Sequence, residues 1–297
     1  MQSLQKKYPL IEQYSGWMIL GFLSLIYAPL IMYWYDGWLN KSISIEHEYF
    51  SHGLIGLPFA VYVAWGNRKA WLKLPDRSHP LGVGLLVLGT LFYLTGLPDF
   101  VNLSLPIILG GICLWLKGMA GFKFQGFPLL LVLLATPTQV PYLITPYIIP
   151  LQSFIAAIAG FILLQFNVNV RVEDIYLYVN DAVVEVAPHC AGLKMLLTSL
   201  YVALMLLYWR DNLDSKLKIN LFLIGTVVLS VLGNIIRNTF LTFFHGTGRE
   251  QIFHWLHESW GGDLYSACML ALLIPLLNGI EKIADNLTIA PEYSEHT

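Results

Sequence analysis

The sequence predicts an all-α polytopic membrane protein with about eight transmembrane helices and a small extracytoplasmic β-hairpin. Of its 297 residues, 56% are hydrophobic and only 12% are charged, which is about half the charged fraction of a soluble domain. A chain with so little charge cannot cover a surface that faces water, so most of its exterior has to meet lipid. The formal net charge of −2 excludes a basic surface of the kind that binds nucleic acids.

Eight apolar stretches are candidates for the crossings, each of which needs about 20 apolar residues. The stretches cover residues 15–35, 51–66, 81–97, 100–116, 126–166, 190–209, 217–244 and 262–281. No linker between them is long enough to separate domains. We therefore predict one transmembrane domain over residues 1–297.

Lysine and arginine in the short loops predict the orientation, because positively charged loops favour the cytoplasmic side. The basic loops lie at residues 6–7, 68–77, 117–123 and 210–218. With all four in the cytoplasm, both termini are cytoplasmic and the start of the 190–209 helix lies at the outer face.

The stretch 126–166 is long enough for two crossings, but two crossings would move the loop 210–218 outside. Its prolines at 137, 141, 146 and 150 favour an interrupted helix, because proline removes a backbone donor and clashes with the preceding turn. We predict that 126–136 crosses the membrane. The path of 137–166 is then broken, and 141–166 is a re-entrant or interfacial segment on the outer side.

Residues 167–189 change to an alternating pattern that is rich in valine and tyrosine, with Asn180-Asp181 at a turn. This pattern predicts a β-hairpin. Because unpaired backbone cannot lie in lipid, we expect the hairpin at the outer surface, where it leads the chain to Cys190.

Three residues at this face are candidates for chemistry. Cys190 starts a helix, whose positive end can lower a thiol pKa. Arg237 lies toward the outer end of the next helix, and His257 lies in the outer loop before the last one. Each also has a structural explanation: a small packing residue, an arginine that extends to the interface, and a boundary histidine. Together, a thiol, an imidazole and a guanidinium suffice for acyl transfer through a thioester.

The stretch 126–281 resembles the exosortase/archaeosortase family of membrane cysteine transpeptidases, and the motifs follow the family's order. They are Phe127-Pro128-Leu129, the proline-rich segment, the hairpin, Cys190-Ala191-Gly192, Asn234-x-x-Arg237 and Leu256-His257-Glu258. Ser51-His52-Gly53 also resembles the start of an early helix in exosortases. The Cys-Ala-Gly form is most similar to the cyanobacterial branch, the cyanoexosortases. Pro188 and His189 depart from the common pattern and leave the substrate motif open.

The resemblance implies a nucleophile at Cys190 and partner residues at Arg237 and His257. It also implies a prokaryotic cytoplasmic membrane, and substrates that are exported proteins with a C-terminal tail of the PEP-CTERM type. Such a tail has a short motif, a membrane helix and a basic end, and the cleaved product passes to an unknown acceptor. We expect no cofactor and no metal. Substrate binding is predicted for His52, Asn234 and Glu258, although His52 is equally well explained as an interfacial histidine.

Two other classes of function stay open at this point. His254 and His257 share a helix face beside Glu258, which suits a zinc-dependent intramembrane hydrolase. That reading leaves Cys190 and Arg237 unexplained, and a chelator that abolishes activity would favour it. A non-enzymatic transporter or polysaccharide-export subunit is the second, and substrate flux that survives loss of Cys190 would favour it.

Overall fold

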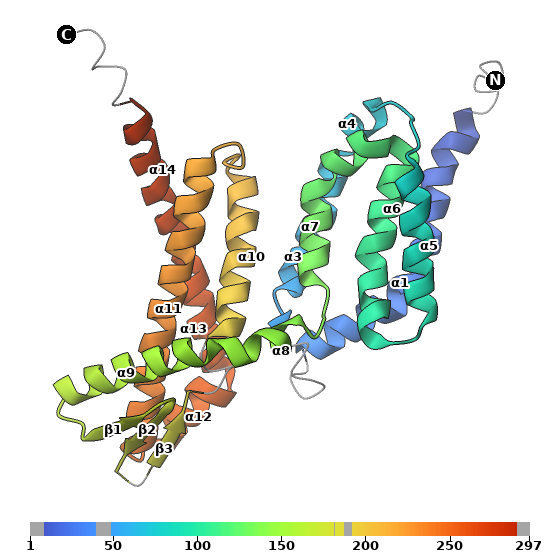
Figure 1. Cartoon of the computed structure of the whole chain (residues 1–297). Helices are drawn as coiled ribbons and strands as arrows, with labels where there is room; N and C mark the ends of the chain where they lie inside the picture. The colour runs from blue at the N-terminus through green and yellow to red at the C-terminus, as the bar shows by residue number, and fades with distance from the viewer. Residues whose placement is uncertain (1–8, 40–48, 181, 187–191, 290–297) are drawn as a thin grey trace, which may run out of the picture. The chain divides into compact units, whose positions relative to one another are not determined.

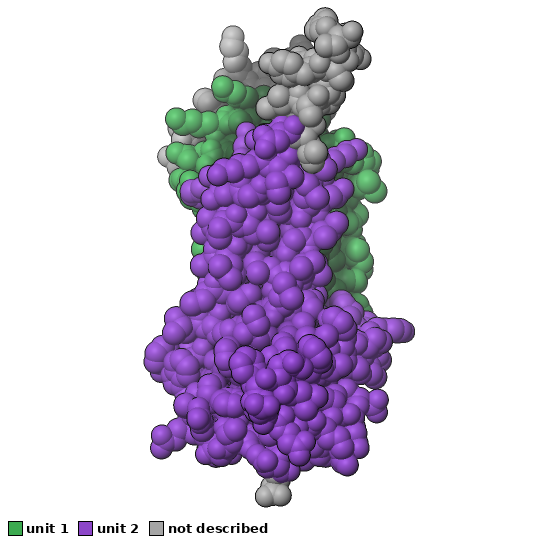
Figure 2. Space-filling view, turned by 90° about the vertical axis from the view of Figure 1, so that its left-hand side faces the viewer, with its two compact units in different colours: residues 1–138 green, residues 139–297 purple. Residues whose placement is uncertain are grey.

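The structure is a computed structural model of the whole chain, in which residues 9–39, 49–180, 182–186 and 192–289 are described. Within these ranges, the chain is mostly helical and carries one small sheet. The elements group into two compact units, residues 1–138 and residues 139–297, which Figure 2 colours separately.

Unit 1 is a group of helices that follow the first apolar stretches of the sequence. The helices are α1 (Pro9–Leu39), α3 (Gly53–Gly66), α4 (Arg68–Lys73), α5 (Pro80–Leu94), α6 (Pro98–Phe124) and α7 (Gly126–Ala135) (Figure 1). Glycine lets α5 approach α6 closely, since a β-carbon on Gly82 would lie 2.7 Å from the backbone nitrogen of Trp115.

Buried polar side chains tie the helices of unit 1 together. The Trp34 indole N–H donates to Oδ1 of Asn102 at 2.8 Å, and Nδ2 of Asn102 donates to the carbonyl oxygen of Pro137 at 3.0 Å. The hydroxyl groups of Tyr27 and Ser104 are also 2.8 Å apart. These bonds satisfy polar groups that burial would otherwise leave unpaired at a cost of about 1–3 kcal/mol each.

Unit 2 is built from helices and one sheet. Its elements are α8 (Val140–Ile144), η1 (Thr145–Ile148), α9 (Ile149–Gln165), β1 (Val170–Glu173), β2 (Tyr176–Val179), β3 (Ala182–Glu185), α10 (Leu193–Trp209), α11 (Lys216–Gly246), α12 (Glu250–Glu258), α13 (Trp260–Ala271) and α14 (Leu273–Ile289). A bundle of α10, α11, α13 and α14 has a core around Phe222, Leu207 and Leu277. Helix α9 runs across α11, and the sheet and α12 lie beyond it (Figure 1).

The predicted hairpin is one half of a three-stranded antiparallel sheet in the order β1-β2-β3. Strands β2 and β3 pair around the turn that begins at Asn180, as the sequence indicates. A second turn at Asp174 adds β1, which pairs Val170 with Val179. Both Asp174 and Asn180 adopt a positive φ, near +52° and +51°, which Asp and Asn tolerate better than most residues. The single-hairpin prediction was wrong in strand number because it used only the turn at Asn180 and not the one at Asp174.

Eight crossings are not confirmed. Among the described residues, three stretches are long and apolar enough to cross a membrane: α6, α11 and Trp260–Asn286. The number rises to four if α7 and Val140–Tyr147 form one broken span. Helices α3, α5, α9 and α10 are apolar but shorter, with 10–17 residues. A helix of 14 residues extends only about 21 Å, less than the roughly 30 Å of a hydrocarbon core.

Prolines explain where several helices begin and end. The predicted crossing 126–136 is α7, which ends just before Pro137. Pro141, Pro146 and Pro150 each lie in the first turn of a new element, where the missing N–H is not needed. The last predicted crossing is divided into α13 and α14 around Leu272. Pro275 cannot donate to the carbonyl of Ala271, at which α13 ends.

Candidate functional site

Asn234 and Gly192 bring two of the sequence motifs into contact. Gly192 is the residue before α10 and has a φ of +82°, a left-handed conformation that glycine adopts at low cost. A β-carbon at this position would lie 2.7 Å from the carboxamide carbon of Asn234 in α11. The contact requires glycine on both counts. It places Asn234 beside the residue that follows Cys190-Ala191 in the chain.

The carboxamide of Asn234 is buried, with 2% of the residue exposed. Neither its oxygen nor its nitrogen has a hydrogen-bond partner within the described parts of the chain, and the same is true of Nε of Arg237 one turn later. Buried polar atoms in folded proteins are nearly always paired, so each exception needs an explanation. A bound substrate group is one explanation that fits the position.

Arg237 lies beside the junction between α12 and α13. Its Nη2 is 3.8 Å from the point that a β-carbon on Gly262 would occupy, and the carbonyl oxygen of Leu256 is 2.8 Å from the same point. Gly261 packs as closely, because its β-carbon would lie 2.6 Å from the Trp255 carbonyl oxygen. The glycine pair therefore lets the start of α13 fold back on the end of α12 next to the guanidinium.

His257 lies in helix α12 and not in a loop, which corrects the predicted local structure; its position on the outer side stays a prediction. Its ring stacks on Phe253 with centroids 5.2 Å apart and planes 8° apart. Phe253 also contacts the ring of His245, whose Nδ1 lies 3.1 Å from a Glu250 carboxylate oxygen. These contacts fasten the start of α12 to the end of α11, and so fix the helix that carries His257.

Tyr265 is a residue of this region that the sequence did not single out. Its hydroxyl donates to the carbonyl oxygen of Gly233 at 2.5 Å. The phenol group of Tyr265 also interacts electrostatically with the Arg237 guanidinium. A tyrosine one turn into an apolar helix is a weak signal. The glycine pair at 261–262 was a better one, since adjacent glycines mark close approach of backbones.

The remaining predicted site residues are placed as follows. Cys190 lies outside the described residues, and α10 begins three positions after it. Glu258 is the last residue of α12. His52 belongs to unit 1, where it precedes α3 and its Nε2 is 3.0 Å from the carbonyl oxygen of Leu134. The part of unit 2 that is described thus unites Asn234 and Arg237 with Gly192 and with the end of α12.

A metal site was one of the open alternatives. Glu250 contacts His245 and lies 3.9 Å from His254. Even so, no group of three His, Cys, Asp or Glu side chains is placed to hold a metal ion within the ranges described above.

Replacing Gly192 with alanine is expected to impair the site strongly. The new methyl group meets both a strained backbone and the Asn234 carboxamide, and each effect costs about 1–3 kcal/mol. Gly248 has a similar φ of +70° but open space around its α-carbon. Gly248→Ala therefore reports strain alone. Thermal unfolding of both variants in detergent measures the difference, and equal losses would mean that the Asn234 contact is unimportant.

The comparisons with known proteins agree with the membrane character of the chain. A family model described as "Transmembrane exosortase" matches residues 34–274, which is more than half of the chain. The chain is also 33% identical over 100 residues to a protein of Synechococcus sp. (strain JA-2-3B'a(2-13)) named phospho-N-acetylmuramoyl-pentapeptide-transferase. That match covers 30% of this chain and only 27% of the relative. No solved structure matches.

Proposed function

Because the chain belongs to the transmembrane exosortase family and is therefore a membrane sorting enzyme, we propose that it is a cysteine transpeptidase that acts on exported proteins. Its substrates carry a C-terminal tail with a short motif, a membrane helix and a basic end. Cys190 forms a thioester with the protein to be sorted; an acceptor nucleophile then attacks the thioester carbonyl, the C–S bond breaks, and the proton of the acceptor returns to the Cys190 thiol. The similarity to the cyanobacterial branch stays a prediction.

One observation supports this proposal more than any other. Two motifs that lie more than 40 residues apart in sequence meet in unit 2, because Gly192 touches Asn234; Arg237, one turn after Asn234, lies beside Gly262. A helix bundle that needed these residues only for packing would not leave Asn234 buried with both amide atoms unpaired among the described residues, since an unpaired buried amide destabilises a fold.

The proposed reaction uses three side chains. His257 takes the thiol proton of Cys190, and the sulfur attacks the carbonyl carbon before the tail. A C–S bond forms and the carbonyl oxygen becomes an oxyanion beside Arg237, whose guanidinium stabilises the negative charge. When the C–N bond breaks, the imidazolium of His257 returns its proton to the leaving amine. Arginine is a poor proton donor at neutral pH, so we assign the acid role to His257.

Substrate binding at His52 and Glu258, and the cytoplasmic position of both termini, remain parts of the proposal. A tail that is itself a membrane helix has to reach the enzyme sideways through lipid. The active site would then lie at the outer face, where a secreted protein leaves its membrane tail.

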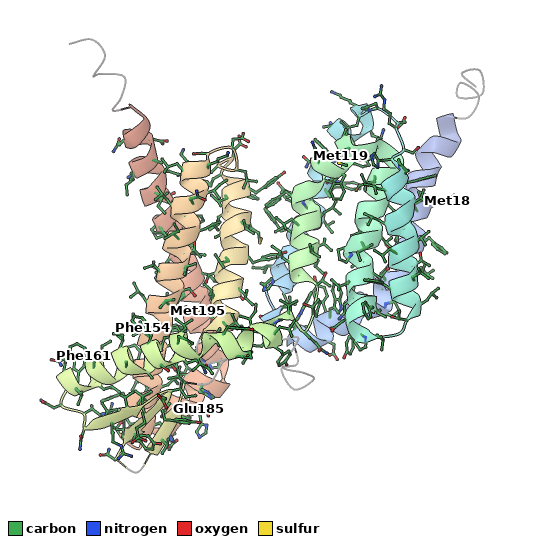
Figure 3. The ribbon with its side chains drawn as sticks, in the orientation of Figure 1. Met18, Met119, Phe154, Phe161, Glu185 and Met195 are labelled. Carbon is green, nitrogen blue, oxygen red and sulfur yellow. The ribbon has the colours of Figure 1, made fainter. Side chains whose placement is uncertain are left out.

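Helix α9 provides a guide to where that face is. The helix carries no charged residue and has two opposite faces. One face packs against the sheet, where a β-carbon on Gly160 would lie 2.3 Å from Cγ2 of Val172. On the same face, Nε2 of Gln152 donates to the carbonyl oxygen of Val186 at 2.7 Å. The other face carries Phe154 and Phe161, whose residues are 51% and 60% exposed to solvent, on the side away from the sheet (Figure 3).

We therefore propose that α9 lies in the interface between lipid and water. An aromatic face fits the boundary of the acyl chains, while Glu185 of β3 projects on the sheet side (Figure 3). This position keeps the bundle of α10, α11, α13 and α14 in the bilayer and the sheet outside it. The segment 141–166 would then be interfacial, which is one of the alternatives that the sequence left open.

Spin labels test this arrangement. In a variant with Cys113→Ser, Cys190→Ala and Cys268→Ser, single labels are placed at Phe161→Cys and at Glu185→Cys and studied in lipid vesicles. We expect the label at 161 to collide mainly with dissolved oxygen, which concentrates in lipid, and the label at 185 to collide mainly with a water-soluble nickel chelate. Nickel access at 161 equal to that at 185 would contradict the interfacial position.

The function itself is tested with a trapped intermediate. The full chain is co-expressed with reporter proteins that end in a panel of PEP-CTERM-type tails, and the membrane fraction is analysed by mass spectrometry at acid pH, where thioesters persist. We expect the tail to be lost and an acylated peptide to contain Cys190. Complete tail loss without any dependence on Cys190 would overturn the proposal.

A further inference from the structure

The turn of α11 that carries Arg237 also carries Asn234, whose side chain has no part in the proposed mechanism. Asn234 is a buried carboxamide with no hydrogen-bond partner among the described residues, and Arg237 follows it by one helical turn. A carboxamide nitrogen donates two hydrogen bonds and carries no charge. Such a donor next to a guanidinium is suited to bind a carbonyl oxygen whose negative charge increases during reaction.

The place of Asn234 favours a backbone carbonyl as its ligand. The carboxamide lies against Gly192 at the start of α10, two residues after Cys190. Because Cys190 precedes Gly192 by only two residues in the sequence, the proposed function brings the attacked carbonyl to this part of the chain. Gly192 has no side chain to keep the substrate away from Asn234, and a methyl group there would collide with the carboxamide.

Tyr265 holds the same turn from the neighbouring helix. Its hydroxyl bonds to the carbonyl oxygen of Gly233, which in an α-helix also accepts the N–H of Arg237. Gly233 is also enclosed, since a β-carbon there would lie 2.3 Å from Cε of Met269 and 2.9 Å from Cε of Met195. The backbone between Asn234 and Arg237 is thus fixed by α10 on one side and by α13 on another.

We infer that the Asn234 carboxamide binds the carbonyl oxygen of the scissile peptide together with Arg237, and that Tyr265 is a positioning residue for both. This inference rests on the proposed function and adds residues to it. Asn234 touches the substrate, whereas Tyr265 acts only through the turn of α11 that it holds.

Kinetics with the full chain in lipid vesicles test the inference, with a PEP-CTERM-tailed reporter as the probe. Asn234→Leu, which keeps the shape but removes the donor, is expected to lower kcat about a hundredfold with little change in KM. Asn234→Asp is measured as well, in case the leucine variant does not accumulate in the membrane. Retention of kcat by Asn234→Asp or Asn234→Leu would overturn the inference.

Tyr265→Phe separates positioning from a merely structural role. We expect a loss in kcat of about tenfold at constant KM, and no further loss when it is combined with Asn234→Leu, because both changes act on one interaction. Ser266→Ala is the control, since the Ser266 hydroxyl donates within its own helix, to the Gly262 carbonyl oxygen at 2.9 Å. Losses that multiply in the double variant would overturn the role of Tyr265.

Cys190→Ala is measured in parallel to keep the two proposals apart. A Cys190→Ala protein that still removes the tail overturns the proposed function. An inactive Cys190→Ala protein beside a fully active Asn234→Leu protein overturns only the present inference.

Discussion

Cys190→Ala is expected to abolish tail removal while the protein stays inserted in the membrane at its normal level. The sulfur is the group that forms the covalent bond, and loss of a nucleophile lowers turnover by about a thousandfold or more in enzymes with covalent catalysis. Alanine is smaller than cysteine, so the substitution adds no bulk. The measurement is the ratio of tailed to processed reporter on a gel after co-expression.

The other two cysteines provide matched controls. Cys113 in α6 is partly buried and Cys268 in α13 is exposed, and both are free thiols. Cysteine in such settings acts as a small hydrophobic residue, so Cys113→Ala and Cys268→Ala should process the reporter as the wild type does. A Cys190→Ala protein that removes the tail normally would instead favour a metal-dependent hydrolase.

The positions of most helices could be predicted from the sequence because an apolar run long enough to fill a bilayer is a strong local signal. The predicted stretches 81–97, 190–209 and 217–244 lie on α5, α10 and α11. The number of crossings could not be predicted in the same way. It depends on how far each helix extends before a cap or a proline, and on whether it crosses the membrane or lies along it.

Helix α9 shows why hydropathy alone is insufficient. Its sequence is as apolar as that of a crossing, but it lies across α11 in the same unit (Figure 1). The contacts of Gly160 and Gln152 with the sheet segment are visible in the folded structure, whereas the sequence gives no sign of them. The prolines at 137, 141, 146 and 150 did indicate an interruption, although they could not indicate the direction of the helix after it.

The candidate site was predictable in part, for a related reason. An asparagine and an arginine one turn apart inside an apolar helix are expensive to bury, so Asn234 and Arg237 attract attention in the sequence. Tyr265 does not, because a tyrosine is common in membrane helices. Its importance follows from a bond to a residue 32 positions away, and such contacts leave no local pattern.

Arg237→Lys is the second change for which we expect a large loss, about a hundredfold in kcat. Lysine keeps the positive charge but replaces a planar fork of five N–H donors by a single flexible ammonium group. Arg237 lies between Asn234 and the glycine pair at the start of α13, and its Nε has no partner within the described part of unit 2. A fork in this position can donate to an oxyanion along a fixed direction, whereas an ammonium group cannot hold that direction.

Arg210→Lys is the control, because Arg210 makes a two-pronged contact with a carboxylate at another part of unit 2. Its Nε and Nη2 donate to the two carboxylate oxygens of Glu281 at 3.1 and 2.6 Å, and ion pairs at the protein surface contribute little to stability. We therefore expect Arg210→Lys to leave turnover unchanged, as measured by single-turnover loss of the reporter tail in vesicles. Normal turnover in Arg237→Lys, with loss of activity in Arg237→Met, would mean that the site needs only a positive charge. Normal turnover in both would assign Arg237 to anchoring at the membrane surface, and the oxyanion would then need a different donor.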